Sequence, residues 1–340
     1  MATKDKMRIF SKGMKQLRRG MRLGIAMGAS IAALTAADVQ AAAKYTLNLS
    51  TVLTTKDPIY KGFEQFKKAV ESRTDGNVVV RLYPSGQLGA DSELIQQAQV
   101  GGNVAVITDG GRLSQFVPEI AILNAPFVFP DYESVIRFVE TPAFKSWEEK
   151  LGEKAGVVSL SFNWFQGSRM MITQKPIEKP DDLKGIRVRV IDSPINIESI
   201  RCVGGTPTPM AWSEVYSALQ TGVIDAAEAH PTALHGAKLY EVAKYVTKTN
   251  QYHLVTSLIV GGKWFNQLPD DYKKILHEEA YKAGQSASQA IIALSDDMLA
   301  EMQKKGVVVS SVELAPFVEA CKGVTAQLGL EEARRKTIEQ

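Results

Sequence analysis

The stretch LKGIRVRVIDSPINIESIRCVGGTPTPMAWSEVYSALQTGVID, residues Leu183–Asp225, decides the fold. It predicts a strand, a helix, a strand, a helix and a strand, in that order. In GIRVRV the apolar side chains fall on one face of the strand, and Arg187 and Arg189 fall on the other. Ser193 followed by Pro194 is typical of a helix start. Arg189 therefore stands where a strand runs into a capped helix, which is a suitable place to hold an anionic ligand.

The N-terminal half of the chain repeats this alternation. The pattern predicts strands at 45–52, 78–83 and 104–108, separated by helices at 58–74 and from Asp91 or Ser92 to Val100. Strands that alternate with helices in this way form a parallel sheet with right-handed crossovers. The sequence thus predicts two α/β frames, one early and one in the middle of the chain.

A long helix is the main feature of the C-terminal third. Pro269–Lys305 contains no strong helix breaker apart from Gly284, and at about 1.5 Å per residue the helix would be roughly 50 Å long. That length exceeds one small lobe, so we expect the helix to lean on two. Upstream, a strand is expected at 157–163, with residues 164–169 leading out of it. A strand at 306–309 and a helix at 314–328 are expected to close the chain.

The first 43 residues have the layout of a secretory signal. A basic segment precedes an apolar run, Leu23–Ala37, and small residues then fit signal-peptidase cleavage near Ala41–Ala43. An uncleaved membrane anchor is the alternative, although the run is too short to span a bilayer comfortably. Arg18-Arg19 matches a twin-arginine signal poorly. The expected location of the mature protein is the periplasm.

The bulk composition allows one large domain or two smaller ones, because 45% of the 340 residues are hydrophobic. The leader carries eight of the 40 basic and two of the 37 acidic residues, which leaves 32 and 35 and a net charge of −3. Nothing in that balance indicates nucleic-acid binding. Export permits a disulfide between Cys202 and Cys321, but two distant cysteines make no framework, and unpaired buried thiols are expected.

Motifs of known chemistry are absent from the sequence. It contains no P-loop, no GxGxxG after a strand and no GxSxG elbow. His230 and His235 are five residues apart, so they do not share a helical face. His277 lacks the second histidine of a zinc protease motif. We therefore predict no enzyme, no cofactor and no metal site.

Several motifs in a fixed order resemble a known family. They are YPSGQLG at Tyr83–Gly89, LKGIRVRV at Leu183–Val190, PTPMAWSEVYSALQTG at Pro207–Gly222 and VIDAAE at Val223–Glu228. The chain resembles the periplasmic solute-binding subunits of tripartite ATP-independent periplasmic (TRAP) transporters, of the DctP type. The resemblance implies an α/β, two-lobed periplasmic binding protein, type II-like, with a hinge and a long lobe-spanning helix.

The resemblance also implies a domain division and a function. After the signal peptide at 1–43, lobe I takes 44–166 plus 255–294, and lobe II takes 167–254 plus 295–340. The lobes close over a small organic carboxylate, which is then delivered to the TRAP membrane permease. A ligand-binding sensor subunit is one alternative. An exported enzyme with Asp109 or His230 as base is another, and a structural envelope protein is the least favoured.

The family's carboxylate-binding arginine falls on Arg189. A guanidinium is always charged and offers a planar fork of donors to both carboxylate oxygens. A second family arginine falls on Arg169, for which a salt bridge near the hinge is the alternative role. Asp109 falls on a position that is acidic in some relatives, and a helix cap is its alternative role. Trp212 falls on an aromatic residue that lines the pocket.

Four more residues complete the expected site. Trp164 and Phe165 are candidates for its apolar lining, although core packing is the commoner role of such side chains. Ala229, followed by His230, stands where sialic-acid-binding relatives often have an asparagine, and Val52 replaces another. Because two polar contacts to a polyhydroxylated ligand are missing, we predict a weakly hydroxylated monocarboxylate. An aromatic or branched 2-oxo or 2-hydroxy acid would fit this description.

Overall fold

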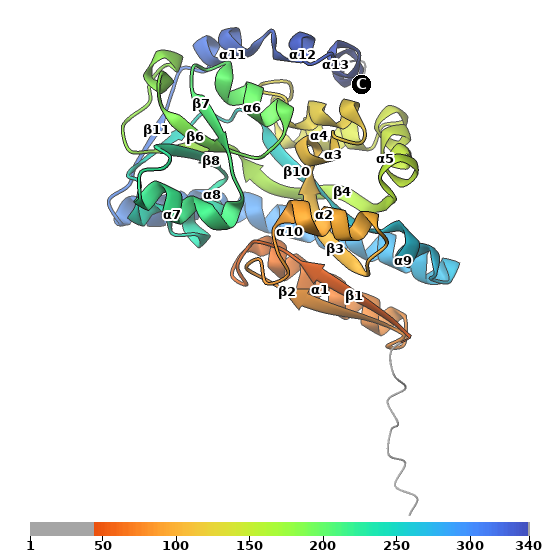
Figure 1. Cartoon of the computed structure of the whole chain (residues 1–340). Coiled ribbons are helices and arrows are strands. Elements are labelled where there is room, and N and C mark those ends of the chain that lie inside the picture. Colours follow the sequence, from red (N-terminus) through yellow and green to blue (C-terminus); the bar gives the residue numbers. More distant parts are fainter. Residues whose placement is uncertain (1–43, 339–340) are drawn as a thin grey trace, which may run out of the picture. The chain divides into compact units, whose positions relative to one another are not determined.

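Two β-sheets organise the computed structural model, which describes residues 44–338. The predicted signal peptide lies outside these residues. The first sheet has the strand order β2-β1-β3-β10-β4 (Figure 1). Its strands are β1 (Tyr45–Ser50), β2 (Val78–Tyr83), β3 (Val104–Asp109), β4 (Val157–Ser168) and β10 (His253–Gly261). Strand β1 pairs in parallel with β2 and β3, which confirms the predicted parallel frame, whereas β10 runs antiparallel to β3 and β4.

The second sheet has the order β11-β9-β5-β8-β6-β7. Its strands are β5 (Met170–Thr173), β6 (Arg187–Val190), β7 (Thr206–Pro209), β8 (Ala226–Ala229), β9 (Tyr245–Lys248) and β11 (Val308–Ser311). Strand β6 pairs in parallel with β7 and β8. Strands β6 and β7 lie within the stretch Leu183–Asp225, as predicted, whereas the strand expected at its end begins one residue later, as β8. Ser193 caps α6 (Pro194–Arg201) by accepting a hydrogen bond from the backbone of Asn196. A 3₁₀ turn, η3 (Trp212–Glu214), leads into α7 (Val215–Gln220).

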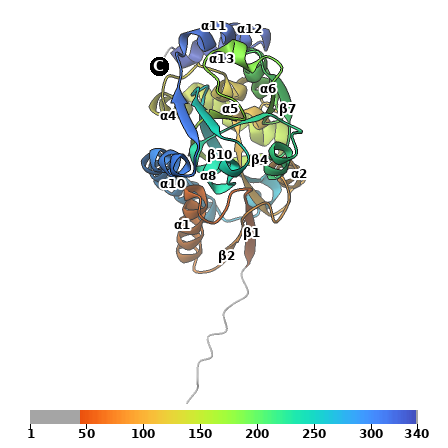
Figure 2. The same cartoon turned by 90° about the vertical axis from the view of Figure 1, so that its left-hand side faces the viewer.

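The longest helix spans both sheets. Helix α10 (Asp270–Lys304) packs against α1 and β4 beside the first sheet and against α8 and β11 beside the second. Figures 1 and 2 both show α10 running next to α1. The prediction of a helix that leans on two lobes is therefore confirmed.

Short helices cover the two sheets. Those of the first half are α1 (Pro58–Arg73), α2 (Asp91–Gln99), α3 (Gly110–Leu113), η1 (Pro118–Asn124), α4 (Tyr132–Val139) and α5 (Pro142–Ala155). Those that follow are η2 (Pro180–Leu183), α8 (Pro231–Gly236), η4 (Leu239–Glu241), α9 (Gly262–Asn266), α11 (Ala315–Cys321), α12 (Val324–Gln327) and α13 (Glu331–Ile338). Helix α1 shows the local logic: Asp57 accepts from the Ile59 backbone at its N-cap, and the buried face includes Phe63 and Phe66.

The chain crosses between the sheets along a two-stranded ribbon. Strand β4 pairs with β10 from Val157↔Gly261 to Ser168↔His253, with register shifts along the way. The strand expected at 157–163 is therefore too short, because β4 continues as far as Ser168. We call the part built on the first sheet lobe I and the part built on the second sheet lobe II. The predicted lobe boundaries stay a prediction; α13, which they assign to lobe II, contacts η1 of lobe I.

A disulfide joins Cys202 to Cys321, 119 residues apart in sequence, with their Cα atoms 4.9 Å apart. The expectation of unpaired thiols is therefore wrong. Cys202 caps the C-terminus of α6 and Cys321 ends α11, and only the tertiary fold brings these two helix ends together. Helix α11 lies beside η2 and α12 beside α6 of lobe II, whereas α13 contacts η1 of lobe I (Figures 1 and 2). The single helix expected at 314–328 is two short helices, α11 and α12.

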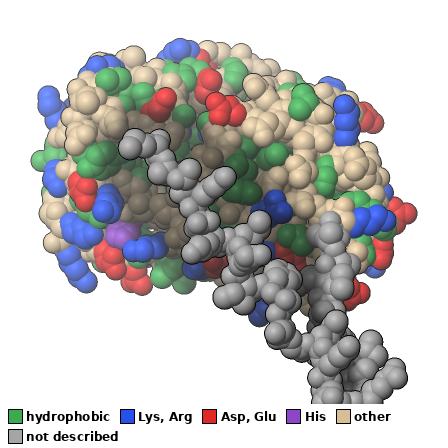
Figure 3. Space-filling model, turned by 60° about the horizontal axis from the view of Figure 1, so that its bottom comes forward, with side chains coloured by type: hydrophobic (Ala, Val, Ile, Leu, Met, Phe, Trp, Pro, Cys, Tyr) green, Lys and Arg blue, Asp and Glu red, His purple; other side chains and the backbone are tan. Residues whose placement is uncertain are grey.

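The surface carries charges of both signs. Lysine, arginine and acidic side chains are interspersed over the face shown in Figure 3, without a large area of one sign. Within residues 44–338, no helix combines the length and the apolar character needed to cross a bilayer.

Candidate functional site

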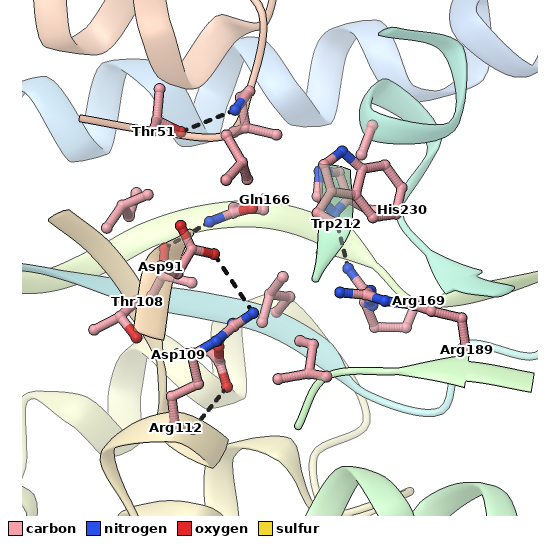
Figure 4. A pocket seen from close by; sticks show the side chains of 17 residues that line it. Thr51, Asp91, Thr108, Asp109, Arg112, Gln166, Arg169, Arg189, Trp212 and His230 are labelled. Carbon is pink, nitrogen blue, oxygen red and sulfur yellow. Dashed lines mark hydrogen bonds and ion pairs between the residues drawn. The ribbon is translucent and has the colours of Figure 1, made fainter. Parts of the chain in front are cut away.

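A cavity of about 50 Å³ lies between the two lobes. That volume holds about three to five water molecules at roughly 10–15 Å³ each. The lining comes mostly from strand ends and the turns that follow them, where ligands bind in open α/β sheets (Figure 4). It consists of Thr51, Val52, Leu53, Asp91, Ile107, Thr108, Asp109, Arg112, Gln166, Arg169, Arg189, Ile191, Trp212, His230, Ala233, Leu254 and Thr256.

The lobe I wall is built around Asp109, the last residue of β3 and the N-cap of α3. Its Oδ1 accepts hydrogen bonds from the Arg112 backbone at 3.1 Å and from Asn124 Nδ2 at 2.9 Å. Its Oδ2 pairs with Arg112 Nη1, and Arg112 Nη2 lies 3.4 Å from Asp91 Oδ2. Burial raises the pKa of the Asp91 carboxyl, and the nearby Arg112 opposes that shift. The cation on this wall is thus already balanced by carboxylates.

Arg169 is balanced in the same way on the lobe II wall. Its Nε donates to Glu228 Oε2 at 2.5 Å, and its Nη2 donates to the Glu228 carbonyl oxygen at 2.7 Å. The Tyr252 hydroxyl donates to the same carboxylate at 3.3 Å. Burial alone would lower the pKa of Arg169, but the pairing with Glu228 raises it above the usual value. The antiparallel pairing of β5 with β8 places these groups side by side.

Arg189 differs from the other two arginines. It is only 2% exposed, and its Nε donates to the Met210 carbonyl oxygen at 3.1 Å. Its guanidinium lies over the Trp212 ring, 5.3 Å from the ring centre. Among residues 44–338, no carboxylate forms a salt bridge with it. Burial lowers the pKa of Arg189 to about 10, although the charge of Glu228 opposes that shift. The guanidinium is therefore a buried cation without a carboxylate partner among residues 44–338.

Three further lining groups have a buried polar atom with no hydrogen-bond partner in the described chain. They are Asp91 Oδ1, Thr108 Oγ1 and His230 Nε2. His230 Nδ1 lies 3.0 Å from Arg169 Nη1. Burial and the charge of Arg169 keep the pKa of His230 well below its usual value, so the ring is neutral near pH 7. The cavity thus combines one cation that has no carboxylate partner with three polar atoms that have no hydrogen-bond partner in the described chain.

The structure brings five of the eight predicted residues to the cavity: Arg189, Arg169, Asp109, Trp212 and His230. The other three lie elsewhere. Trp164 and Phe165 belong to the lobe I core, because β4 continues through them. Phe165 stacks on Tyr132 with ring centres 4.5 Å apart.

Trp164 packs so closely between α1 and α10 that a Cβ at Gly62 would come within 2.8 Å of its ring. Ala229 is fully buried in the lobe II core. The expectation of an aromatic lining from Trp164 and Phe165 is therefore not met in this arrangement of the lobes.

The family follows from comparison with known proteins. The model of a family described as "Bacterial extracellular solute-binding protein, family 7" (DctP) matches residues 49–332. This chain belongs to that family.

Its relatives include the C4-dicarboxylate-binding periplasmic protein DctP of Rhodobacter capsulatus. The two are 32% identical over 255 residues, 74% of this chain and 75% of that one. A solved TRAP periplasmic solute-binding protein from Escherichia fergusonii, in an apo open structure, is 53% identical, with a TM-score of 0.77 over 87% of this chain and 99% of that one. A TRAP solute-binding protein from Ochrobacterium anthropi with bound L-fuconate is 32% identical, with a TM-score of 0.83 over 87% of this chain and 100% of that one.

Taken together, the family and these structures identify the chain as a solute-binding subunit of a TRAP transporter, of an extracytoplasmic family that serves transport. The ligand-bound relative matches the structure better than the open one, although its sequence is less similar.

Sequence reasoning missed several lining residues of this TRAP solute-binding protein. The sequence pattern indicates only a helix start at Asp91 and assigns no role to Arg112. A usable signal existed for Arg112, because it follows the end of a parallel strand, where ligand sites of α/β sheets gather. Gln166 and Thr256 could not be found in this way, since they lie within β4 and β10.

Proposed function

We propose that this TRAP solute-binding protein captures a monocarboxylate whose two oxygens bind the Arg189 guanidinium. The observation that carries the proposal is the missing counter-charge of that side chain. A buried charge is costly unless it is paired. Arg112 and Arg169 already have carboxylate partners in the chain, so one cation remains for the ligand. A ligand carboxylate would supply the ion-pair partner that Arg189 lacks within the described chain.

The aliphatic part of the remaining lining supports a branched ligand, and the polar side chains beside it, Thr51, Thr108, Gln166 and Thr256, can bind a small number of oxygen atoms. Five aliphatic side chains face the cavity, from Val52, Leu53, Ile107, Ile191 and Leu254. They suit a branched aliphatic tail, whereas the small cavity leaves little room for an aromatic ring. We therefore narrow the expected ligand to a branched 2-oxo or 2-hydroxy monocarboxylate, which the protein delivers to a TRAP permease.

The two bases of the enzyme alternative are both held by arginines. Asp109 accepts hydrogen bonds from Arg112 and Asn124, and His230 Nδ1 faces Arg169. A group engaged in this way is poorly placed to take a proton from a substrate. This arrangement supports binding without chemistry on the ligand.

Thermal-shift screening followed by calorimetry tests the proposal. We expect branched 2-oxo and 2-hydroxy acids to raise the melting temperature of the mature protein more than succinate, glycerol 3-phosphate or L-fuconate, because a bound ligand stabilises by mass action. Arg187→Ala is the matched control for Arg189→Ala: Arg187 lies two residues away on β6 but is exposed and paired with Asp225. Tight binding of a sugar acid or a dicarboxylate, with no response to branched acids, would refute the ligand class. Equal affinity in wild type and Arg189→Ala would refute the clamp.

A further inference from the structure

His230 is held in place from several sides. It follows β8, stands at the N-cap of α8 and is 2% exposed. Gly167 of β4 passes so close that a Cβ there would lie 2.9 Å from His230 Cβ. The φ of Gly167, +125°, is one that residues with a side chain rarely adopt. The imidazole therefore has a fixed position next to Arg169.

The contact with Arg169 determines which ring nitrogen carries the proton. A guanidinium has five N–H donors and no acceptor. Since Arg169 Nη1 lies 3.0 Å from His230 Nδ1, that nitrogen must accept the hydrogen bond. In a neutral imidazole the single proton is then on Nε2. Protonation of Nδ1 would place two donors face to face and is disfavoured.

Nε2–H is consequently a fixed donor without an acceptor. Its nitrogen is buried, and it has no hydrogen-bond partner in the described chain. A buried donor of this kind is rare in native proteins. His230 lines the cavity on the same wall as Arg169 and Arg189, as Figure 4 shows. The missing acceptor is thus expected on the ligand, close to its carboxylate.

We infer that His230 donates from Nε2 to the C2 oxygen of the ligand and that this selects a 2-oxo acid. This inference rests on the proposed capture of a carboxylate by Arg189. The neighbouring cavity groups on this wall, Arg169, Arg189 and His230, all present donors. An oxo oxygen only accepts, whereas a 2-hydroxyl also brings a donor that needs an acceptor. Glu228, whose Oε1 is unpaired, is not among the residues that line the cavity.

Nitrogen-15 NMR of the ligand-free protein tests the tautomer without any ligand. The His230 signals are assigned by their loss in His230→Gln. We expect the neutral ring with the proton on Nε2, unchanged between pH 5.5 and 8. A proton on Nδ1, or a titration near pH 6.5, would overturn the inference.

Calorimetry with three matched acids tests the selectivity. The probes are 2-oxo-3-methylbutanoate, 2-hydroxy-3-methylbutanoate and 3-methylbutanoate, which differ only at C2. In wild type we expect the 2-oxo acid to bind about 10- to 100-fold more tightly than the unsubstituted acid, the range for leaving one buried donor unpaired. The 2-hydroxy acid should fall between them.

Variants assign that preference to His230. His230→Phe should reduce the ratio to about threefold or less by weakening only the substituted acids, and His230→Gln should restore part of it through its amide donor. His235→Gln, in the same helix but paired with Glu301, is the control and should keep the wild-type ratio.

An unchanged ratio in His230→Phe overturns the inference, as does the failure of all three acids to bind wild type. If a different acid binds in an Arg189-dependent manner, the capture of a carboxylate by Arg189 stands and only the C2 selectivity falls. If binding is independent of Arg189, the proposed function itself fails.

Discussion

Arg169 and Arg189 share one wall of the cavity and are buried to nearly the same degree, 3% and 2% exposed, yet their surroundings are opposite. Arg169 has Glu228 as a partner within the lobe, together with the Glu228 carbonyl oxygen. Arg189 has one backbone carbonyl oxygen and an aromatic ring. Arg169 thus has a counter-ion within the described chain, and Arg189 does not.

This difference suggests separate roles: Arg169 supports the wall of the cavity, and Arg189 binds the ligand. A paired buried arginine contributes a fixed shape and charge to the wall, and removing either partner leaves a lone buried charge. An unpaired buried arginine raises the free energy of the ligand-free protein, and a bound carboxylate relieves that cost. The predictions below test whether the two side chains really divide the work in this way.

The largest expected effect is on stability. Arg169→Met leaves Glu228 buried without a cation, so we expect the free energy of unfolding to fall by about 3–5 kcal/mol. Arg189→Met leaves no lone charge, so the ligand-free protein should lose no more than about 1 kcal/mol or gain stability. Urea unfolding followed by circular dichroism measures both. Similar losses of unfolding free energy in the two variants would contradict the separate roles of Arg169 and Arg189.

The next largest effect on stability is expected from removing the disulfide, whose cysteines do not line the cavity. Cys202 lies at the far end of α6, the helix that follows the strand of Arg189. Removing the bond with Cys202→Ala and Cys321→Ala should lower the free energy of unfolding by about 2–5 kcal/mol. Ligand affinity of the folded protein should stay the same, because β6, the Met210 carbonyl oxygen and the Trp212 ring position Arg189. A tenfold loss of affinity would show that the C-terminal helices hold the clamp.

The smallest effect concerns pH and the partner of Arg169. The pKa of His230 is lowered in the folded state, so the unfolded chain binds its proton first as the pH falls. The neutral ring therefore supports the fold above pH about 6.5, and that support is lost below it, by at most about 1.4 kcal/mol per pH unit. His230→Gln should show a correspondingly weaker loss of stability between pH 6.5 and 5. Identical slopes in the two proteins would mean that burial and the charge of Arg169 do not hold the ring neutral.

Local patterns were sufficient to predict much of the fold. The alternation in Leu183–Asp225 and the capped start at Ser193 predicted β6, α6, β7 and α7 in the right order, and the strand expected at the end of the stretch begins one residue later, as β8. The absence of breakers in Pro269–Lys305 gave α10. These features depend on neighbours in sequence, so the sequence contains the information needed to predict them.

The errors concern features that depend on tertiary contacts. Trp164 and Phe165 looked like pocket residues because the strand was expected to end at Asn163, whereas pairing with β10 extends it to Ser168. The Cys202–Cys321 bond spans 119 residues and has no local signal. Arg189 was placed through the family motif, but no pattern in the sequence shows that Glu228 serves Arg169 and leaves Arg189 without a partner.

Calorimetry on a pair of arginine-to-lysine variants tests the central claim most directly. Arg189→Lys keeps the positive charge but removes the planar fork that fits a carboxylate, and Arg187→Lys makes the same change at the exposed first residue of β6. With the best ligand from the screen, we predict that Arg189→Lys weakens binding by at least about 30-fold, roughly 2 kcal/mol, while Arg187→Lys binds like wild type. Wild-type affinity in Arg189→Lys would contradict the account.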